Sequence, residues 1–290
     1  MAMQNHVRNP LEWGWEHLKQ TGQAVGSAAH TMDGAWEDRA ALPPVVRRIG
    51  AANIGDALAK GFRDFGACRT DVVFLCLLYP IAGLVISRMA FDYGMLALVF
   101  PMIAGFALVA PLFGVGLYEI SRRREQGLPT SWTDAFAVVR SPAIGSIMVM
   151  GLLLLAIFCL WLFAANFIYT VTLGPDAPVS ATAFARDALT TPAGWTMTVV
   201  GIGVGFLFAL VVLVIGVVSF PMLLDRRAGV GTAIATSVRA VAMNPGPMAM
   251  WGLIVAGMLL LGAIPLLVGL AIVLPVLGHA TWHLYRKVVD

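Results

Sequence analysis

Charged residues are scarce in this sequence. Only 12% of its 290 residues are Asp, Glu, Lys or Arg, about half the usual share in a soluble domain, whereas 59% are hydrophobic. A soluble fold of this size would have too little charge to cover its surface, and the apolar content excludes a disordered chain. The glycines follow no three-residue period, which excludes a collagen-like rod. The composition therefore predicts a polytopic membrane protein.

Cysteines and catalytic motifs are also few. Cys68, Cys76 and Cys159 lie in or beside apolar segments, without the spacing of a metal site and without enough partners for a disulfide scaffold. The chain has no Ser/His/Asp set, Cys/His pair, carboxylate dyad or phosphate-binding loop at a spacing that catalysis requires. We therefore expect a protein that is not an enzyme and that carries no cofactor.

The sequence does contain long apolar runs. A bilayer core about 30 Å thick needs about 20 apolar residues in a helix. The last run is too long for one crossing, because it would extend roughly 55 Å as a helix, and we expect it to fold back around 262–265. Six spans are therefore predicted, in the runs 72–87, 95–118, 144–169, 195–223 and, twice, 248–284.

The positions of lysine and arginine predict the orientation of these spans. Six spans place both termini on one side, and all 19 basic residues except Arg88 and Arg186 fall on that side. Basic residues accumulate in cytoplasmic loops. We therefore expect cytoplasmic termini, an outside loop over 174–193 and a location in the cytoplasmic (inner) membrane. The net charge of +3 reflects this asymmetry, so no nucleic-acid partner is expected.

The first 45 residues differ from the rest of the chain. They are polar and contain several carboxylates, and they lack the apolar core of a signal peptide. Leu11, Trp15 and Leu18 recur at near-helical spacing, which fits a surface helix, while a partly disordered tail fits equally well. We predict a cytoplasmic tail over 1–45 and a membrane domain over 46–290.

A short pattern recurs three times, in NIGDALAKGFR (53–63), SWTDAFAVVR (131–140) and GVGTAIATSVR (229–239). Each copy begins with a residue suited to capping a helix and ends with arginine. Asp56 and Asp134 lie three residues after the cap, where a carboxylate favours the helix dipole. Apolar residues at i and i+4, such as Ile54, Leu58 and Phe62, indicate an amphipathic helix.

Each copy of the pattern precedes two predicted spans. The expected fold is therefore all-α, with six transmembrane helices in three hairpins, each preceded by a short amphipathic cytoplasmic helix. The three repeat units would cover about 53–119, 131–224 and 229–285, all in the same orientation. They would then differ from the inverted repeats of many transporters.

A few polar residues are candidates for contacts with a solute or a partner. Glu119 ends the second span and can pair with Arg122 or Arg123 at i+3 or i+4, which would anchor the helix or form a gate. Asn166 lies within the third span, where it would form an interhelical hydrogen bond or contact a substrate. Arg140 and Arg239, which end two copies of the pattern, complete this set.

His279 and His283 lie at i and i+4 in the last span and are weak candidates for a metal site. No histidine on another span opposes them, and with Trp282 and Tyr285 they are more typical of an interfacial aromatic belt. Gly201 and Gly205 lie inside a span with no strand before them, which argues against a nucleotide-binding loop. Their spacing favours a small-residue face for close helix packing.

The chain resembles a known family in several motifs: RTDVVFLCLLYPIAGLV, GLYEISRRREQG, LTTPAGW, SVRAVAMNPGPMAMWGLIVA and LPVLGHATWHLYRKVV. This is a bacterial family of predicted integral membrane proteins with a domain of unknown function, and the resemblance covers roughly 46–289. It implies an inner-membrane protein with about six spans and no assigned reaction. Some relatives are labelled as similar to subunit I of cytochrome c oxidase, but an oxidase core needs several more intramembrane histidines.

Two functions remain open from the sequence. The first is a non-enzymatic accessory protein that assembles or organises another membrane complex or the lipid around it. The sparse intramembrane charge and the Gly/Ala-rich packing faces favour it. The alternative is a transporter or channel for an apolar or weakly polar solute, with Asn166 and Glu119 as its polar contacts. In both cases the lipid bilayer is the expected surrounding.

Overall fold

The computed structural model describes residues 44–67, 81, 88, 95–226, 228–265 and 267–290. The predicted tail and the first predicted span, 72–87, lie outside the described residues. Within the described ranges the chain is nearly all helical, and its one extended pairing is an isolated antiparallel bridge between Val46 and Val289.

The described spans begin with a broken helix. After the short η1 (Leu96–Leu98), α3 (Val99–Phe113) and α4 (Val115–Glu125) follow one another through Gly114. Pro111 near the end of α3 has no N–H to donate within the helix, which weakens the hydrogen-bond ladder just before the break. Together these elements form one candidate span, Leu96–Glu125.

The longest helices are α5 (Ile144–Thr172) and α7 (Pro192–Gly216), and α7 continues through a short break into α8 (Ser219–Asp225). Between α5 and α7 lies α6 (Ala181–Thr190), a helix that the sequence analysis did not predict. Ser180 and Thr191 cap α6 and α7 by accepting hydrogen bonds from backbone N–H groups. The expected outside loop is therefore partly helical.

The C-terminal third consists of α9 (Val230–Met243), α10 (Pro245–Ala263) and α11 (Leu270–Val288). The last apolar run folds back after Ala263, as predicted. Asn244 stops α9, and Pro245 begins α10 in the first-turn position where proline fits a helix.

Among the described residues, four helices are long and apolar enough to cross a membrane: Leu96–Glu125, Ile144–Thr172, Pro192–Asp225 and Pro245–Ala263. They coincide with the second to fifth predicted spans. The sixth predicted span corresponds to α11, which is not among the four candidates in the described residues. The reason is its polar C-terminal half, which contains His279, His283, Arg286 and Lys287.

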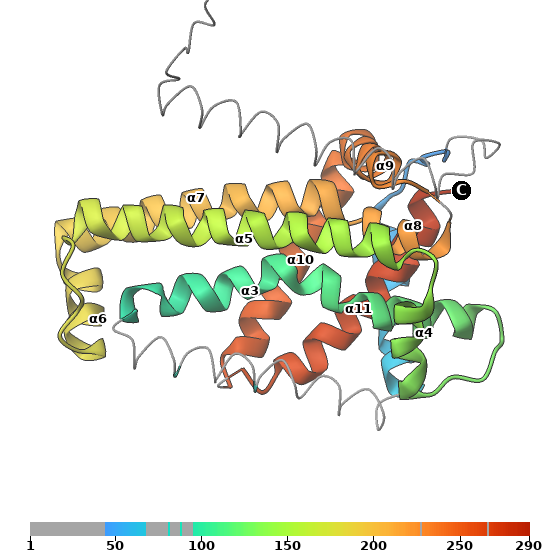
Figure 1. The fold of residues 1–290 in the computed structure, drawn as a ribbon, viewed down its shortest axis with the longest axis horizontal. Helices are drawn as coiled ribbons and strands as arrows, with labels where there is room; N and C mark the ends of the chain where they lie inside the picture. The colour runs from blue at the N-terminus through green and yellow to red at the C-terminus, as the bar shows by residue number, and fades with distance from the viewer. Residues whose placement is uncertain (1–43, 68–80, 82–87, 89–94, 227, 266) are drawn as a thin grey trace, which may run out of the picture.

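Figure 1 shows α5 and α7 side by side, with α6 at one end of the pair and α4, α8, α9 and the C-terminus at the other. At that second end α4, α8 and α11 contact one another. We call this region the terminal end of the molecule. The α10–α11 hairpin is inclined to the long helices, and its connection does not lie beside α6.

Helices are found at all three copies of the repeated pattern: a helix over 51–67, the 3₁₀-helix η2 (Trp132–Arg140) and α9. Each packs through small residues. A Cβ placed on Gly61 would lie 2.7 Å from the Cβ of Ala280, and one on Gly116 would lie 3.0 Å from the Cβ of Ala135. In α9, Ser237 donates to the carbonyl of Val214 at 2.7 Å.

The predicted apolar face of the first copy was partly wrong. Ile54 is buried as expected, but Phe62 is 53% exposed. A straight α-helix drifts away from a strict four-residue spacing, because each turn takes 3.6 residues. The buried face therefore moves on to Ala57, Gly61 and Asp64, and Phe62 turns outward.

Most of the largest fully buried side chains gather at the terminal end, including Trp282, Tyr285, Phe220 and Ile120. Along α5 and α7, by contrast, many large apolar side chains are exposed, such as Phe163 and Phe206. This distribution suits helices that face lipid over most of their length and pack tightly at one end.

Candidate functional site

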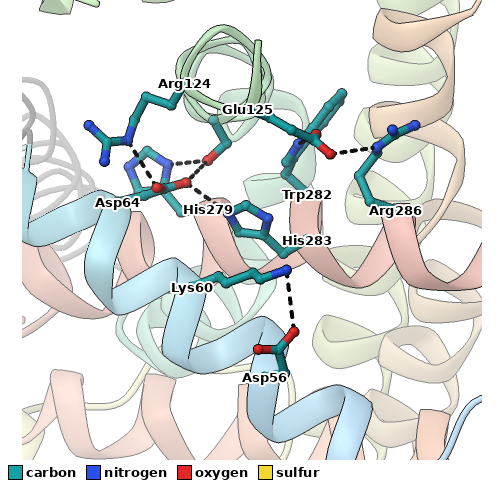
Figure 2. A network of polar contacts seen from close by, with 10 residues as sticks. Asp56, Lys60, Asp64, Arg124, Glu125, His279, Trp282, His283 and Arg286 are labelled. Atoms are coloured by element: carbon teal, nitrogen blue, oxygen red, sulfur yellow. Dashed lines mark hydrogen bonds and ion pairs between the residues drawn. The ribbon is translucent and has the colours of Figure 1, made fainter. Parts of the chain in front are cut away.

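A buried polar cluster lies at the terminal end, centred on Asp64 of the 51–67 helix (Figure 2). The Asp64 carboxylate accepts hydrogen bonds from Ser121 Oγ at 2.7 Å and from Arg124 Nε at 2.9 Å, both on α4. It also contacts His283 Nε2 of α11 at 2.8 Å. His279, one turn earlier on α11, completes the cluster through a 2.8 Å contact between its Nδ1 and Ser121 Oγ.

The charge of Asp64 is strongly favoured. Burial acts to raise its pKa, but the hydrogen bonds from His283, Ser121 and Arg124 outweigh this effect and lower the pKa to about 2. Asp64 is therefore ionised at neutral pH. An ionised carboxylate can only accept hydrogen bonds, so Ser121 and His283 must both donate to it.

This charge state determines the tautomer of His279. Ser121 has one hydroxyl hydrogen, which it donates to Asp64, so its oxygen can only accept from His279. The hydrogen of the neutral ring then lies on Nδ1, and Nε2 carries a lone pair. That Nε2 is buried and has no hydrogen-bond partner among the described residues.

The cluster does not have the geometry of a nucleophilic site. In a catalytic triad, the histidine accepts the hydroxyl hydrogen of serine and donates to the carboxylate. Here Ser121 donates directly to the carboxylate, and the free nitrogen of His279 faces away from the hydroxyl oxygen. The arrangement ties three helices together and does not activate an oxygen.

A second set of contacts joins α11 to α4 and α8. Glu125 of α4 accepts from Trp282 Nε1 at 3.0 Å and from Arg286 Nε at 3.1 Å (Figure 2). Asp225 at the end of α8 accepts from the Tyr285 hydroxyl at 2.8 Å. The C-terminal half of α11 is thus bonded to both α4 and α8.

Glu119 pairs as the sequence predicted. Its buried carboxylate accepts from Arg122 Nε at 2.8 Å and from Arg123 Nε at 3.1 Å. Arg123 also donates to Asp134 of η2 at 2.6 Å. Glu119 therefore belongs to an ion-pair chain that holds η2 against α4.

The chain segments around Val46 and Val289 meet at this same place. Beside the Val46–Val289 bridge, Arg47 N donates to the carbonyl of Val288 at 2.8 Å. The buried Asn244 accepts from Ile49 N at 2.8 Å and donates to the carbonyl of Arg47 at 3.0 Å. Lys287 lies 2.6 Å from Asp56 and lowers the pKa of that carboxyl.

The other predicted residues lie apart from the cluster. Asn166 is exposed on α5, and its backbone carbonyl accepts from Thr170. Arg140 is exposed at the end of η2, and Arg239 is exposed within α9, one turn before its end. The space beside Gly205 is filled by Trp161 of α5, 3.0 Å from a Cβ placed there, whereas Gly201 has nothing within 4 Å. Within the described residues, the glycine face is used for packing at one of its two positions.

The C-terminal half of α11 carries the histidine pair. His279, Trp282 and Tyr285 are fully or almost fully buried, so they belong to the core of the terminal end. In the part of the chain that the structure describes, no group of three or more His, Cys, Asp or Glu residues is arranged to hold a metal ion. His279 and His283 are instead engaged with Ser121 and Asp64.

The sequence analysis missed Asp64, Ser121 and Arg124 as members of the site. Asp64 lies 219 residues from His283, so nothing local connects the two. One signal was available: His279 and His283 face the same side of a helix, and buried imidazoles need hydrogen-bond partners. The identity of those partners depends on which helices pack against α11.

Comparison with protein families gives a match over part of the chain. Residues 99–225 match the family described as "Predicted integral membrane protein (DUF2189)". The matched segment runs from α3 to α8 and contains Glu119, Ser121 and Arg124, but not Asp64 or the histidines. The resemblance predicted from the sequence is confirmed over this segment. Comparisons with curated proteins and with solved structures find no match.

Proposed function

We propose that this integral membrane protein is a non-enzymatic organiser of the inner membrane, which holds another membrane complex or the surrounding lipid through its outer surface. The observation that carries the proposal is the use of its buried polar side chains. The buried Asp64, Ser121, His279 and Ser237 all bond to other helices of the same chain, and the buried Glu119 pairs with arginines of its own helix. These groups stabilise the fold, while the long helices have exposed apolar side chains along their outer faces.

We also propose a six-span topology with both termini in the cytoplasm. The four candidate spans supply four crossings, the run 72–87 supplies the first, and α11 enters the membrane by its apolar first half. The terminal end, which carries most of the described basic residues, then lies in the cytoplasm, and α6 lies outside.

The packing of the amphipathic helices supports three repeat units. The 51–67 helix packs on α11, η2 on α4, and α9 on α7 and α8. The second and third amphipathic helices thus each cover the end of a span from the preceding unit. The first amphipathic helix, 51–67, covers the end of the last span. Because α4, α8 and α11 contact one another inside, this pattern is a closed pseudo-threefold ring.

The test is the native size and protein composition of the tagged chain, extracted from its own membrane in a mild detergent. The proposal expects co-migration with another membrane protein at fixed stoichiometry, or a defined set of retained lipids. A lone particle that moves a solute in reconstituted vesicles would overturn it in favour of a transporter.

If transport were found, Asn166→Ala and Glu119→Gln would show which polar residue contacts the solute. Asn166 is exposed, so its variant leaves the ion-pair chain intact, whereas Glu119→Gln also loosens η2. Loss of flux in Asn166→Ala at unchanged stability would mark a solute contact. Loss of flux in Glu119→Gln alone, together with a lower melting temperature, would indicate a structural effect.

A further inference from the structure

The three amphipathic helices share a short pattern of exposure in their C-terminal halves. In 61–63, 138–140 and 237–239, a buried residue is followed by an exposed apolar residue and then by an exposed arginine. The apolar residues are Phe62, Val139 and Val238, which are 53%, 65% and 41% exposed. Each site therefore presents an apolar side chain directly before a cation, a combination suited to the boundary between headgroups and acyl chains.

The arginines of this pattern differ from most other cations of the chain. Arg122, Arg123, Arg124, Arg226 and Arg286 each form an ion pair at the terminal end. Arg63, Arg140 and Arg239 form none with the described residues, and besides them this holds only for the neighbouring Arg48. The pattern therefore presents three cations that are available to an external anion.

The inner faces of the same helices are already occupied. Gly61 packs against Ala280, Ala135 against Gly116, and Ser237 bonds to the carbonyl of Val214. Figure 1 shows α9 end-on, across the direction of α5 and α7, so it lies parallel to the membrane plane if these helices span the bilayer. A helix in that position presents its outer side chains to the headgroup region.

We propose that Phe62–Arg63, Val139–Arg140 and Val238–Arg239 form a collar that binds anionic phospholipids of the cytoplasmic leaflet. Each guanidinium binds a headgroup phosphate, for which its planar donor fork is well suited. Each apolar neighbour inserts at the acyl boundary. The charge complementarity between three unpaired arginines and an anionic leaflet selects lipid as the occupant. This inference rests on the proposed function and names the lipid class that the protein organises.

The experiment compares phosphatidylglycerol with phosphatidylcholine of the same acyl chains. The full-length protein is purified in detergent, and each lipid is titrated while the melting temperature and the bound lipid, by native mass spectrometry, are followed. The wild type is expected to bind phosphatidylglycerol more tightly. A cation near an anionic surface contributes about fivefold in affinity, so Arg63→Gln/Arg140→Gln/Arg239→Gln should reduce the preference about a hundredfold.

Three controls accompany the triple variant. Arg63→Lys/Arg140→Lys/Arg239→Lys keeps the charge and should retain most of the preference. Arg186→Gln, which changes an exposed arginine on α6, should behave like the wild type. Raised salt should weaken the preference, because it screens exposed charges. Should the triple variant fail to fold, each single glutamine variant still predicts about a fivefold loss.

A triple glutamine variant with the wild-type preference for phosphatidylglycerol would overturn the collar. So would inorganic phosphate that competes fully with the lipid at matched ionic strength, which would indicate a soluble anion as ligand. If the triple variant lost a protein partner but kept the lipid preference, the collar would be assigned to that partner. If the wild type transported a solute and the triple glutamine variant lost the lipid preference, the proposed function would be refuted while the collar would be supported.

Discussion

At the scale of single residues, Asp64 is the most connected side chain of the cluster. It accepts from three donors on two other helices while only 10% of its side chain is exposed. A buried carboxylate is stable only when its charge is matched in this way. Removing the charge therefore leaves Arg124 and His283 without their acceptor, in a region of low dielectric constant.

We predict that Asp64→Asn lowers the free energy of unfolding at pH 7 by about 1–2 kcal/mol. The pKa of Asp64 is about 2 in the folded protein, below its ordinary value of 3.8, so its contribution is present above about pH 4 and is lost as the pH falls toward 2. The difference between wild type and variant should therefore shrink over this range. Melting curves in detergent at several pH values measure it.

The exposed Asp56 provides the matched control, because Asp56→Asn removes a carboxylate from the same helix outside the buried cluster. It should change stability by less than Asp64→Asn at pH 7. An Asp64→Asn curve that parallels the wild type at every pH would show that the carboxylate contributes nothing to folding.

His279 and Ser121 allow an asymmetric test of the cluster. His279→Phe removes the buried Nε2, which lacks a partner among the residues that the structure describes, and Ser121 still donates to Asp64. Ser121→Ala removes a donor from Asp64 and leaves the Nδ1–H of His279 unpaired, which costs about 1–3 kcal/mol. Thermal unfolding should therefore rank Ser121→Ala as the less stable variant. The opposite ranking would mean that Nε2 makes a favourable contact of its own.

At the scale of elements, the repeated pattern explains why one amphipathic helix is wound differently. The buried pairs Ala57/Gly61 and Ala233/Ser237 are four residues apart, as an α-helix requires. The second copy is one residue shorter, so Ala135 and Val138 are only three apart. A 3₁₀-helix has three residues per turn, and η2 adopts it, which keeps both residues on the inner face.

A pair of glycines in the 51–67 helix tests this packing. A Cβ on Gly61 would lie 2.8 Å from the backbone nitrogen of Ala280, whereas Gly55 has nothing within 4 Å. Gly61→Ala should force the helix away from α11 and cost about 1–3 kcal/mol. Gly55→Ala should be neutral or stabilising by about 0.5–1 kcal/mol through better helix propensity. Equal effects of the two changes would contradict the close approach.

The sequence predicted elements well where the signal is local. The runs at 95–118, 144–169 and 195–223 became α3–α4, α5 and α7–α8, because an apolar run of sufficient length identifies a span by itself. The fold-back after Ala263 followed from length alone. Short α6 was missed, since its ten residues carry neither an apolar run nor the repeated pattern.

At the scale of the whole molecule, the arrangement depends on contacts that no local pattern encodes. The buried site joins Asp64 to α4 and α11, and Asn244 joins the start of the domain to the start of α10. Each pair is chosen by how the helices pack, which is why the sequence suggested the histidines but not their partners. Contacts of this kind also join residues near 46 to residues near 289, which lie at opposite ends of the described chain.

The proposed topology places the terminal end and α6 on opposite sides of the membrane. Val179, just before α6, is 98% exposed, and Leu128, between α4 and η2, is 49% exposed. In a background without Cys68, Cys76 and Cys159, we expect a membrane-impermeant maleimide to label Val179→Cys in intact cells once the outer barrier is permeabilised. Leu128→Cys should be labelled only after the inner membrane is opened, because a charged reagent cannot cross the bilayer. Labelling of both cysteines from the same side would refute an odd number of crossings between residues 128 and 179, and with it the proposed ring of three equally oriented units. The reverse labelling pattern would keep the ring and invert its orientation in the membrane.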